Sequence, residues 1–170
     1  ETELNDKSIS HYPYQLDQKG YIVANNVYTR KEIRDIGRLI QKYGEQHPEL
    51  KNDSMYAIRK LFNVIPKLKE LCINPNLKKI LSQFDEGYFL TKAIYFDKPA
   101  KSNWSVIWHQ DLPINVKEKK ETKGYKAWTK KHEVISVIPP ENILHNTITI
   151  RIHLDDAFET NGGLNIIPGS

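Results

Sequence analysis

The hydrophobic pattern of this chain changes its period once, at the turn formed by Asp85, Glu86 and Gly87. Before this turn, apolar residues recur every three to four positions, which is the spacing of a helix that buries one face. After it, they alternate with polar residues or form short runs, which is typical of β-strands. The chain has 170 residues and 39% hydrophobic content, enough for one domain with a core. We therefore predict a single α+β domain over residues 1–170, mainly helical over residues 16–87 and mainly β over residues 88–170.

Helix signals stand at defined places in the first part. Thr29 and Glu32 form a capping box, in which the two side chains satisfy backbone amides at the start of a helix. Apolar residues follow at helical spacing, which predicts a helix over residues 31–46 that Pro48 ends. The other elements expected here are short: helices over residues 65–71 and 75–84, a strand over residues 20–24, and a loose polar lead-in over residues 1–15.

Five short strands bounded by turn signals are expected around and after the change of period. They span residues 88–96, 104–111, 134–138, 146–155 and 164–168, and the first two form a predicted hairpin. The long polar connection over residues 112–131 is interpreted either as a lid or as a disordered surface loop. Helices followed by short strands fit a mostly antiparallel double-sheet barrel with the helices packed on one sheet.

A candidate metal half-site ends the second of these strands. His109 and Asp111 are two residues apart, so on an extended chain both side chains leave the same face. One imidazole and one carboxylate are two of the three ligands of a two-histidine, one-carboxylate site for Fe(II), which leaves positions open for substrate and oxygen. The same spacing also arises by chance at exposed strand ends, so the assignment of a metal site needs further signals from the rest of the chain.

Composition limits the expected partners. The net charge is +4, and seven lysines lie between residues 117 and 131. A nucleic-acid binder has a broader basic stripe or a recognisable module, so a solvated lysine-rich loop is favoured and no nucleic acid is expected. No apolar run approaches the roughly 18 residues of a membrane helix, so no membrane is expected. Cys72 is the only cysteine, which excludes an intrachain disulfide and favours a reducing, cytoplasmic setting.

Two motifs, in this order, resemble the phytanoyl-CoA dioxygenase family. The first is Trp-His-Gln-Asp at residues 108–111, and the second is Asn-Gly-Gly-Leu-Asn-Ile-Ile-Pro-Gly-Ser at residues 161–170. Gly-Tyr-Ile-Val at residues 20–23 and the capped helix add to the resemblance, which covers about residue 16 to residue 170. It implies a double-stranded β-helix, or jelly roll, that uses Fe(II) and 2-oxoglutarate to hydroxylate a small organic molecule.

By this resemblance, His109 and Asp111 are the first two iron ligands. Related halogenases carry a small residue in place of the carboxylate, so Asp111 favours hydroxylation. Lys92 and Arg151 lie on strands near the motif and are the candidates to bind a carboxylate of 2-oxoglutarate by charge-assisted hydrogen bonds. A surface or salt-bridged role is the alternative for both cations.

The chain departs from the family pattern at its end. In the family, a histidine follows the Ile-Pro-Gly-Ser segment at once, and the third ligand and the 2-oxoglutarate anchor come some tens of residues later. This sequence ends at Ser170, so we expect a C-terminally truncated member whose last strands are missing. His145 or His153 as a substitute third ligand is the less plain account, because the family's third ligand comes from a later strand.

The alternatives to an active oxygenase are a non-catalytic fragment or binding module of the same fold, and a metal-binding jelly roll of another kind.

Overall fold

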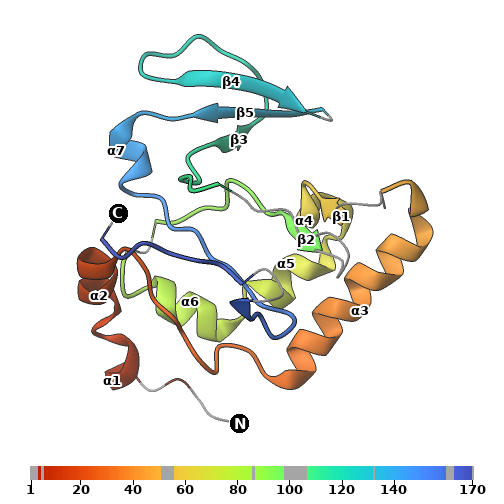
Figure 1. Cartoon of the computed structure of the whole chain (residues 1–170), viewed down its shortest axis with the longest axis vertical. Helices are drawn as coiled ribbons and strands as arrows, with labels where there is room; N and C mark the ends of the chain where they lie inside the picture. The colour runs from red at the N-terminus through yellow and green to blue at the C-terminus, as the bar shows by residue number, and fades with distance from the viewer. Residues whose placement is uncertain are drawn as a thin grey trace.

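The computed structural model describes residue 4 and residues 6–50, 56–85, 87–97, 107–131, 133–159 and 163–169. This part of the chain is α+β, with helices in the first half and two small antiparallel sheets (Figure 1). In chain order the elements are α1 (Asp6–Ile9), α2 (Tyr12–Lys19), α3 (Arg30–Gln46), η1 (Pro48–Leu50), β1 (Tyr56–Ile58), α4 (Leu61–Val64), α5 (Lys67–Cys72), α6 (Pro75–Leu81), β2 (Tyr95–Asp97), β3 (Ile114–Val116), β4 (Lys126–Lys131), β5 (Val134–Ile138) and α7 (Glu141–Leu144).

Helix α3 begins and ends close to the predicted residues because its start is capped. The Thr29 hydroxyl accepts a hydrogen bond from the Glu32 amide at 3.2 Å, and the Thr29 amide donates to the Glu32 carboxylate at 2.7 Å. This reciprocal pair confirms the predicted capping box. After Gln46 the chain passes into a short 3₁₀ turn that begins at Pro48, as expected for a residue that cannot continue a helix.

The main core lies between the helices and the sheet formed by β1 and β2. These strands pair antiparallel, with Ile58 opposite Tyr95. The apolar face of α3 packs on this sheet together with α4 and α5, which confirms that the N-terminal helices cover a sheet. The buried members of this core are Ile36, Ile40, Ile58, Leu61, Ile65, Leu68 and Cys72.

The lead-in is more ordered than predicted. Residues 6–9 and 12–19 form α1 and α2, and Ile9 and Tyr12 are buried in a second core. Ile9 ends α1 and Tyr12 begins α2, so the two buried residues lie on different helices and show no single helical stripe in the sequence. They pack with Val27 and with the buried face of α6. The expectation of a loose segment over residues 1–15 is therefore wrong for its described residues.

Asn74 joins the two cores as the N-cap of α6. Its side-chain oxygen accepts the Leu77 amide at 2.8 Å. Its amide group donates to the Val27 carbonyl at 2.9 Å and to the Glu32 carboxylate at 3.0 Å. With 3% of its surface exposed, Asn74 is a buried polar residue whose hydrogen bonds hold α6 against the start of α3.

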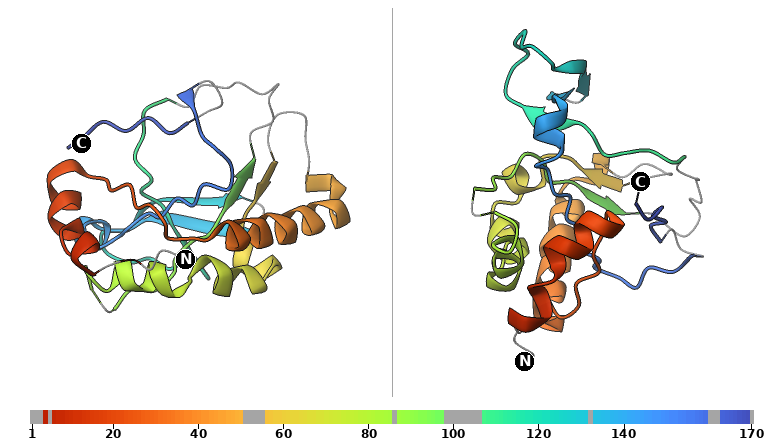
Figure 2. Two further views of the ribbon diagram at one scale, coloured as in Figure 1. Left: turned by 90° about the horizontal axis from the view of Figure 1, so that it is seen from below. Right: turned by 90° about the vertical axis from the view of Figure 1, so that its left-hand side faces the viewer.

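The second sheet has the order β3-β5-β4 and stands apart from the helices (Figures 1 and 2). Its central strand, β5, confirms the strand predicted over residues 134–138, and its Val137 is fully buried. Both edge strands come from residues 112–131, so this segment is neither a disordered loop nor a lid without structure. A bulge in β4 between Lys126 and Thr129, where Ala127 has φ +54°, disguised its strand pattern in the sequence.

Several predicted strands do not form in the described residues. Only Tyr95–Asp97 of the strand expected over residues 88–96 is a strand, and it pairs with β1 instead of with the half-site segment. Residues 98–106 lie outside the described residues, and with them the turn of the expected hairpin and the start of its second strand. The other predicted strands that are absent from the described part of the chain are those over residues 20–24, 146–155 and 164–168 and the described part, residues 107–111, of the strand over residues 104–111.

The physical reason is the pairing that a strand requires. A helix satisfies its own backbone groups, but a strand needs a neighbour for each row of amides and carbonyls. The alternation predicted for residues 146–155 survives without a ladder: Ile152 and Leu154 pack on the main core, while Arg151 and His153 are exposed. Within the described residues there is accordingly no closed barrel. No helix among them is long and apolar enough to cross a membrane.

Candidate metal centre

The candidate half-site lies on an irregular segment, residues 107–113, that leads into strand β3. The chain bends at Trp108, and the Leu112 amide donates to the Gln110 carbonyl at 3.0 Å, which closes a three-residue turn around Asp111. His109 and Asp111 are both exposed. The described residues 107–111 do not form the regular strand that was expected to point both side chains to one face. The orientation of the Asp111 carboxylate depends on this turn instead.

The His109 ring is oriented by its own backbone. Its Nδ1 lies 2.8 Å from the Ile107 carbonyl oxygen. A carbonyl only accepts hydrogen bonds, so Nδ1 carries the proton of this contact, and in the neutral ring the lone pair of Nε2 is then free. A metal-binding histidine typically has this arrangement, with one nitrogen for the metal and the other donating to a carbonyl. The chemistry of His109 therefore fits a neutral imidazole ligand.

Lys92 reaches the same segment from the strand-like residues before β2. Its Nζ donates to the Pro113 carbonyl at 3.1 Å, two residues beyond Asp111. This contact ties residues 87–94 to the half-site segment across 21 positions of sequence. The predicted 2-oxoglutarate anchor therefore lies beside the half-site segment, although its ammonium group here bonds to the backbone.

The other candidate residues are not gathered with the half-site. Arg151 and His153 are exposed on the segment that follows α7. His145 Nε2 lies 3.4 Å from the Glu141 carboxylate, one helical turn away. Among the residues that the structure describes, no group of three His, Cys, Asp or Glu side chains is arranged to hold a metal ion. The described residues therefore supply the half-site without a third ligand.

The glycine motif near the end of the chain has two conformational requirements. A Cβ on Gly163 would lie 2.8 Å from the Phe158 carbonyl oxygen, to which the Gly163 amide donates at 2.9 Å. Gly169 has φ +72°, and its amide donates to the Lys19 carbonyl at 2.9 Å. This bond brings the last described residues back to the end of α2, as Figure 1 shows. The two ends of the stretch that resembles the family are thus neighbours in space. Asn161 and Gly162 lie outside the described residues.

The comparison with protein families gives one finding. The family model described as phytanoyl-CoA dioxygenase matches residues 16–170. The chain belongs to the phytanoyl-CoA dioxygenase family. This match confirms the resemblance carried by the motifs at residues 108–111 and 161–170, and it includes every predicted site residue. No curated protein and no solved structure matches the chain.

Two functional groups of the site are backbone carbonyls, which side-chain patterns do not predict. The Ile107 carbonyl orients His109, and the Pro113 carbonyl receives Lys92. A metal-binding histidine is generally expected to donate a hydrogen bond to a partner from the ring nitrogen that does not bind the metal. The nature of that partner depends on the bend at Trp108, for which the sequence has no glycine or proline signal.

Proposed function

We propose that this protein is an oxygenase that depends on Fe(II) and 2-oxoglutarate and hydroxylates a small organic molecule on a jelly-roll scaffold. Membership of the phytanoyl-CoA dioxygenase family supports the general class of reaction. The observation that carries the assignment of residues is the 2.8 Å contact between His109 Nδ1 and the Ile107 carbonyl. It leaves Nε2 free for a metal, two residues from the Asp111 carboxylate.

In this proposal, His109 and Asp111 hold Fe(II), and Lys92 binds a carboxylate group of 2-oxoglutarate. Arg151, which is exposed on the segment that follows α7, is the second candidate for this role. The bound iron supplies the redox chemistry that couples loss of CO₂ from 2-oxoglutarate, with formation of succinate, to insertion of oxygen into a C–H bond. The chain's own residues prepare the site. The Ile107 carbonyl orients the imidazole of His109, and the backbone hydrogen bond from Leu112 to Gln110 closes a turn around Asp111.

Lys92 has two tasks in this proposal. Its hydrogen bond to the Pro113 carbonyl holds the half-site segment, and its ammonium charge attracts the dianionic cosubstrate. The ammonium group of Lys92 has three N–H donors, so it can bond to the Pro113 carbonyl and to a bound carboxylate at the same time. Lys92→Met therefore raises the KM for 2-oxoglutarate more than it lowers kcat, whereas a purely structural role would reduce the amount of folded protein and leave KM unchanged.

The test is release of succinate by the complete natural protein, measured by proton NMR with Fe(II), ascorbate and 2-oxoglutarate. We expect His109→Ala and Asp111→Ala each to lower the rate by at least a hundredfold, because each removes a metal ligand. His145→Ala is the matched control, since this histidine contacts Glu141 instead of the half-site. Succinate release that survives both ligand substitutions would refute the assigned pair.

A direct metal measurement separates the oxygenase from a binding module of the same fold. Co(II) is a spectroscopic substitute for Fe(II), and its absorption in the visible range reports the number of ligands. Saturable Co(II) binding that His109→Ala removes, without any succinate release, would assign a metal-binding module. No Co(II) binding would overturn both functions.

A further inference from the structure

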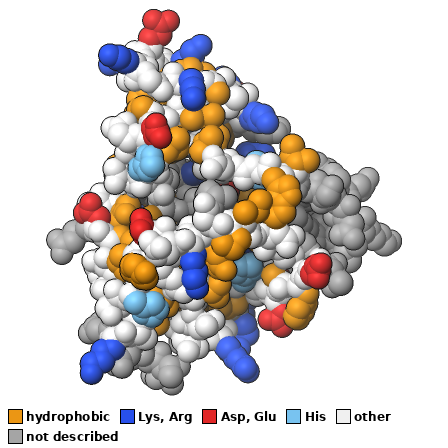
Figure 3. Space-filling view, turned by 60° about the vertical axis from the view of Figure 1, so that its left-hand side comes forward, with side chains coloured by type: hydrophobic (Ala, Val, Ile, Leu, Met, Phe, Trp, Pro, Cys, Tyr) orange, Lys and Arg blue, Asp and Glu red, His pale blue; other side chains and the backbone are white. Residues whose placement is uncertain are grey.

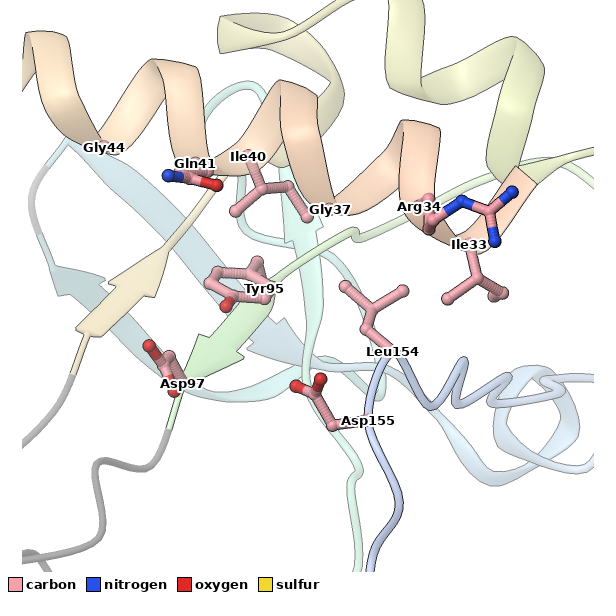
Figure 4. Close-up of a pocket in the computed structure, with 10 residues that line it drawn as sticks. All are labelled: Ile33, Arg34, Gly37, Ile40, Gln41, Gly44, Tyr95, Asp97, Leu154 and Asp155. Carbon is pink, nitrogen blue, oxygen red and sulfur yellow. The ribbon is translucent and has the colours of Figure 1, made fainter. Parts of the chain in front are cut away.

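A cavity of about 360 Å³ lies outside the proposed iron site, beneath α3 (Figure 4). Its walls come from α3, from β2 and from residues 154 and 155. This volume lies within the range of pockets that bind small molecules. None of the residues assigned to iron or 2-oxoglutarate lines it. The cavity is therefore a separate feature that the proposed oxygenase function does not use.

Gly37 forms part of the roof of this cavity. It stands near the middle of α3, where glycine is less favourable than alanine because it loses more conformational freedom on folding. A Cβ added to Gly37 would have no heavy atom within 4 Å, so no close packing against a neighbour requires the glycine here. The space that the missing side chain leaves open belongs to the cavity.

Two carboxylates give the cavity its charge. Asp97 and Asp155 line it from β2 and from the segment after Leu154, and in Figure 4 the carboxylate of Asp155 points into the hollow. Both aspartates are exposed, and within the described part of the chain neither has an ion-pair partner. Arg34 also lines the cavity, but Figure 4 shows its guanidinium group extending away from the two aspartates. The end of the cavity at Asp97 and Asp155 is thus negative.

Apolar side chains cover the opposite part of the cavity. Ile40 and Leu154 face each other across the hollow, next to Gly37 (Figure 4). Leu154 also packs on the main core, so this wall is held in place. The cavity therefore combines an apolar wall with two exposed carboxylates in its lining.

We infer that this cavity binds a small primary alkylammonium ion. The ammonium group lies between Asp97 and Asp155, where it replaces part of its hydration by charge-assisted hydrogen bonds. The short alkyl chain lies over Gly37, between Ile40 and Leu154, where it leaves water. An anion of the same length is repelled by the two carboxylates, and a neutral alcohol gains only the apolar contact.

The test uses n-pentylamine as the probe, titrated into the complete natural protein without iron and followed by calorimetry at pH 7 and low salt. Pentanoate and pentan-1-ol are the matched anionic and neutral probes. We expect saturable binding of one amine, and binding of the alcohol and the anion at least tenfold weaker. Asp97→Asn and Asp155→Asn each weaken amine binding about three- to tenfold, as expected for exposed ion pairs.

Gly37→Leu tests the position of the alkyl chain. The new side chain enters open space, so the helix content and the unfolding midpoint are retained or rise while amine binding is lost. Lys42→Leu places the same side chain on an exposed position of α3 outside the cavity and leaves amine binding unchanged.

Three results would overturn the inference: no saturable binding of the amine, equal binding of pentan-1-ol, or unchanged binding in Gly37→Leu. If the leucine variant does not fold, the two exposed asparagine variants decide alone. All these measurements are made without iron or 2-oxoglutarate, so they do not depend on the proposed oxygenase.

Discussion

The helices of the first half and the strand-forming segments of the second half differ in how their apolar residues are covered. In the first half, Leu68 is fully buried and Ile36 is 1% exposed. In the second half, Phe89 and Ile107 are each 82% exposed. A helix needs only a surface to pack on, because its backbone bonds are internal. A segment without a paired neighbour has no ladder to fix its position, so it buries fewer of its apolar side chains. Ile152 and Leu154, which pack on the main core without a ladder, are only partly buried.

Strand β5 belongs to the second half, like the exposed segments, so a comparison with it shows the effect of pairing. It has β3 on one side and β4 on the other, and its Val137 is fully buried. The segment at residues 163–167 contains three large apolar residues but has no strand beside it in the described part of the chain, and all three are exposed: Leu164, Ile166 and Ile167. Apolar composition alone therefore does not bury a strand.

The largest expected contrast comes from one substitution made in both halves. Leu68→Ala removes a fully buried side chain from the main core and should lower the free energy of unfolding by about 3 kcal/mol. Leu164→Ala makes the same chemical change at a side chain in the unpaired segment that is 55% exposed, and should cost less than about 0.5 kcal/mol. Urea unfolding followed by circular dichroism measures both. Equal losses would show that the second half is packed as well as the first.

The next effect tests how the helices are joined to one another. Asn74→Ala should lower the free energy of unfolding by about 2 kcal/mol, because it removes the cap of α6 and leaves the Val27 carbonyl without this donor. Asn63→Ala, at an exposed position of α4, is the control and should change the free energy by less than about 0.5 kcal/mol. If Asn74→Ala lowers the protection from hydrogen exchange only in α6 and leaves the global free energy of unfolding unchanged, Asn74 caps one helix without joining the two cores.

Local signals predicted α3, α5 and α6 but missed α1, α2 and α4. The capping box and the apolar spacing placed α3 within one residue of its start, and β5 matched its predicted range. The segments without a ladder were predicted as strands from the same kind of composition. Whether such a segment becomes a strand depends on partners far away in sequence, which single-residue preferences do not contain. The edge strands β3 and β4 escaped prediction for the opposite reason, since each becomes a strand by pairing with β5.

The residues of the candidate site come from the motif at residues 108–111, and their roles stay predictions. The family match covers this motif without singling out any side chain. The groups that support the candidate residues could not be predicted from the sequence. The tautomer of His109 and the position of Lys92 depend on backbone carbonyls, and these follow from the bends of an irregular segment. A motif names the groups that carry the chemistry, whereas their orientation is a tertiary property.

A smaller effect depends on pH and tests the capped start of α3. The backbone hydrogen bond from Thr29, with help from Asn74, holds the pKa of the Glu32 carboxyl below its ordinary value of 4.5. Because the folded pKa is lowered, the carboxylate stabilises the fold above pH 4.5, and this contribution is lost as the pH falls through the folded pKa. Glu32→Gln should therefore cost about 1 kcal/mol or less at pH 7 and lose less stability than the wild type between pH 5 and about pH 3. Glu70→Gln, at an exposed position of α5, is the control and should keep the wild-type pH dependence of unfolding.

The smallest effect on stability is expected at the most exposed apolar residue before β2. Phe89→Ser should change the free energy of unfolding by less than about 0.5 kcal/mol, because a side chain that is 82% exposed in the folded protein loses little burial. Exposed apolar side chains still favour contact between molecules; Figure 3 shows several gathered on one face of the protein. Sedimentation equilibrium should accordingly show weaker self-association of Phe89→Ser than of the wild type. Lys123→Ser, at an exposed position of the second sheet's loop, should leave self-association unchanged. A loss of more than about 1 kcal/mol in Phe89→Ser would mean that the ring is covered in the folded protein, and the contrast between the two halves would then no longer hold at this position.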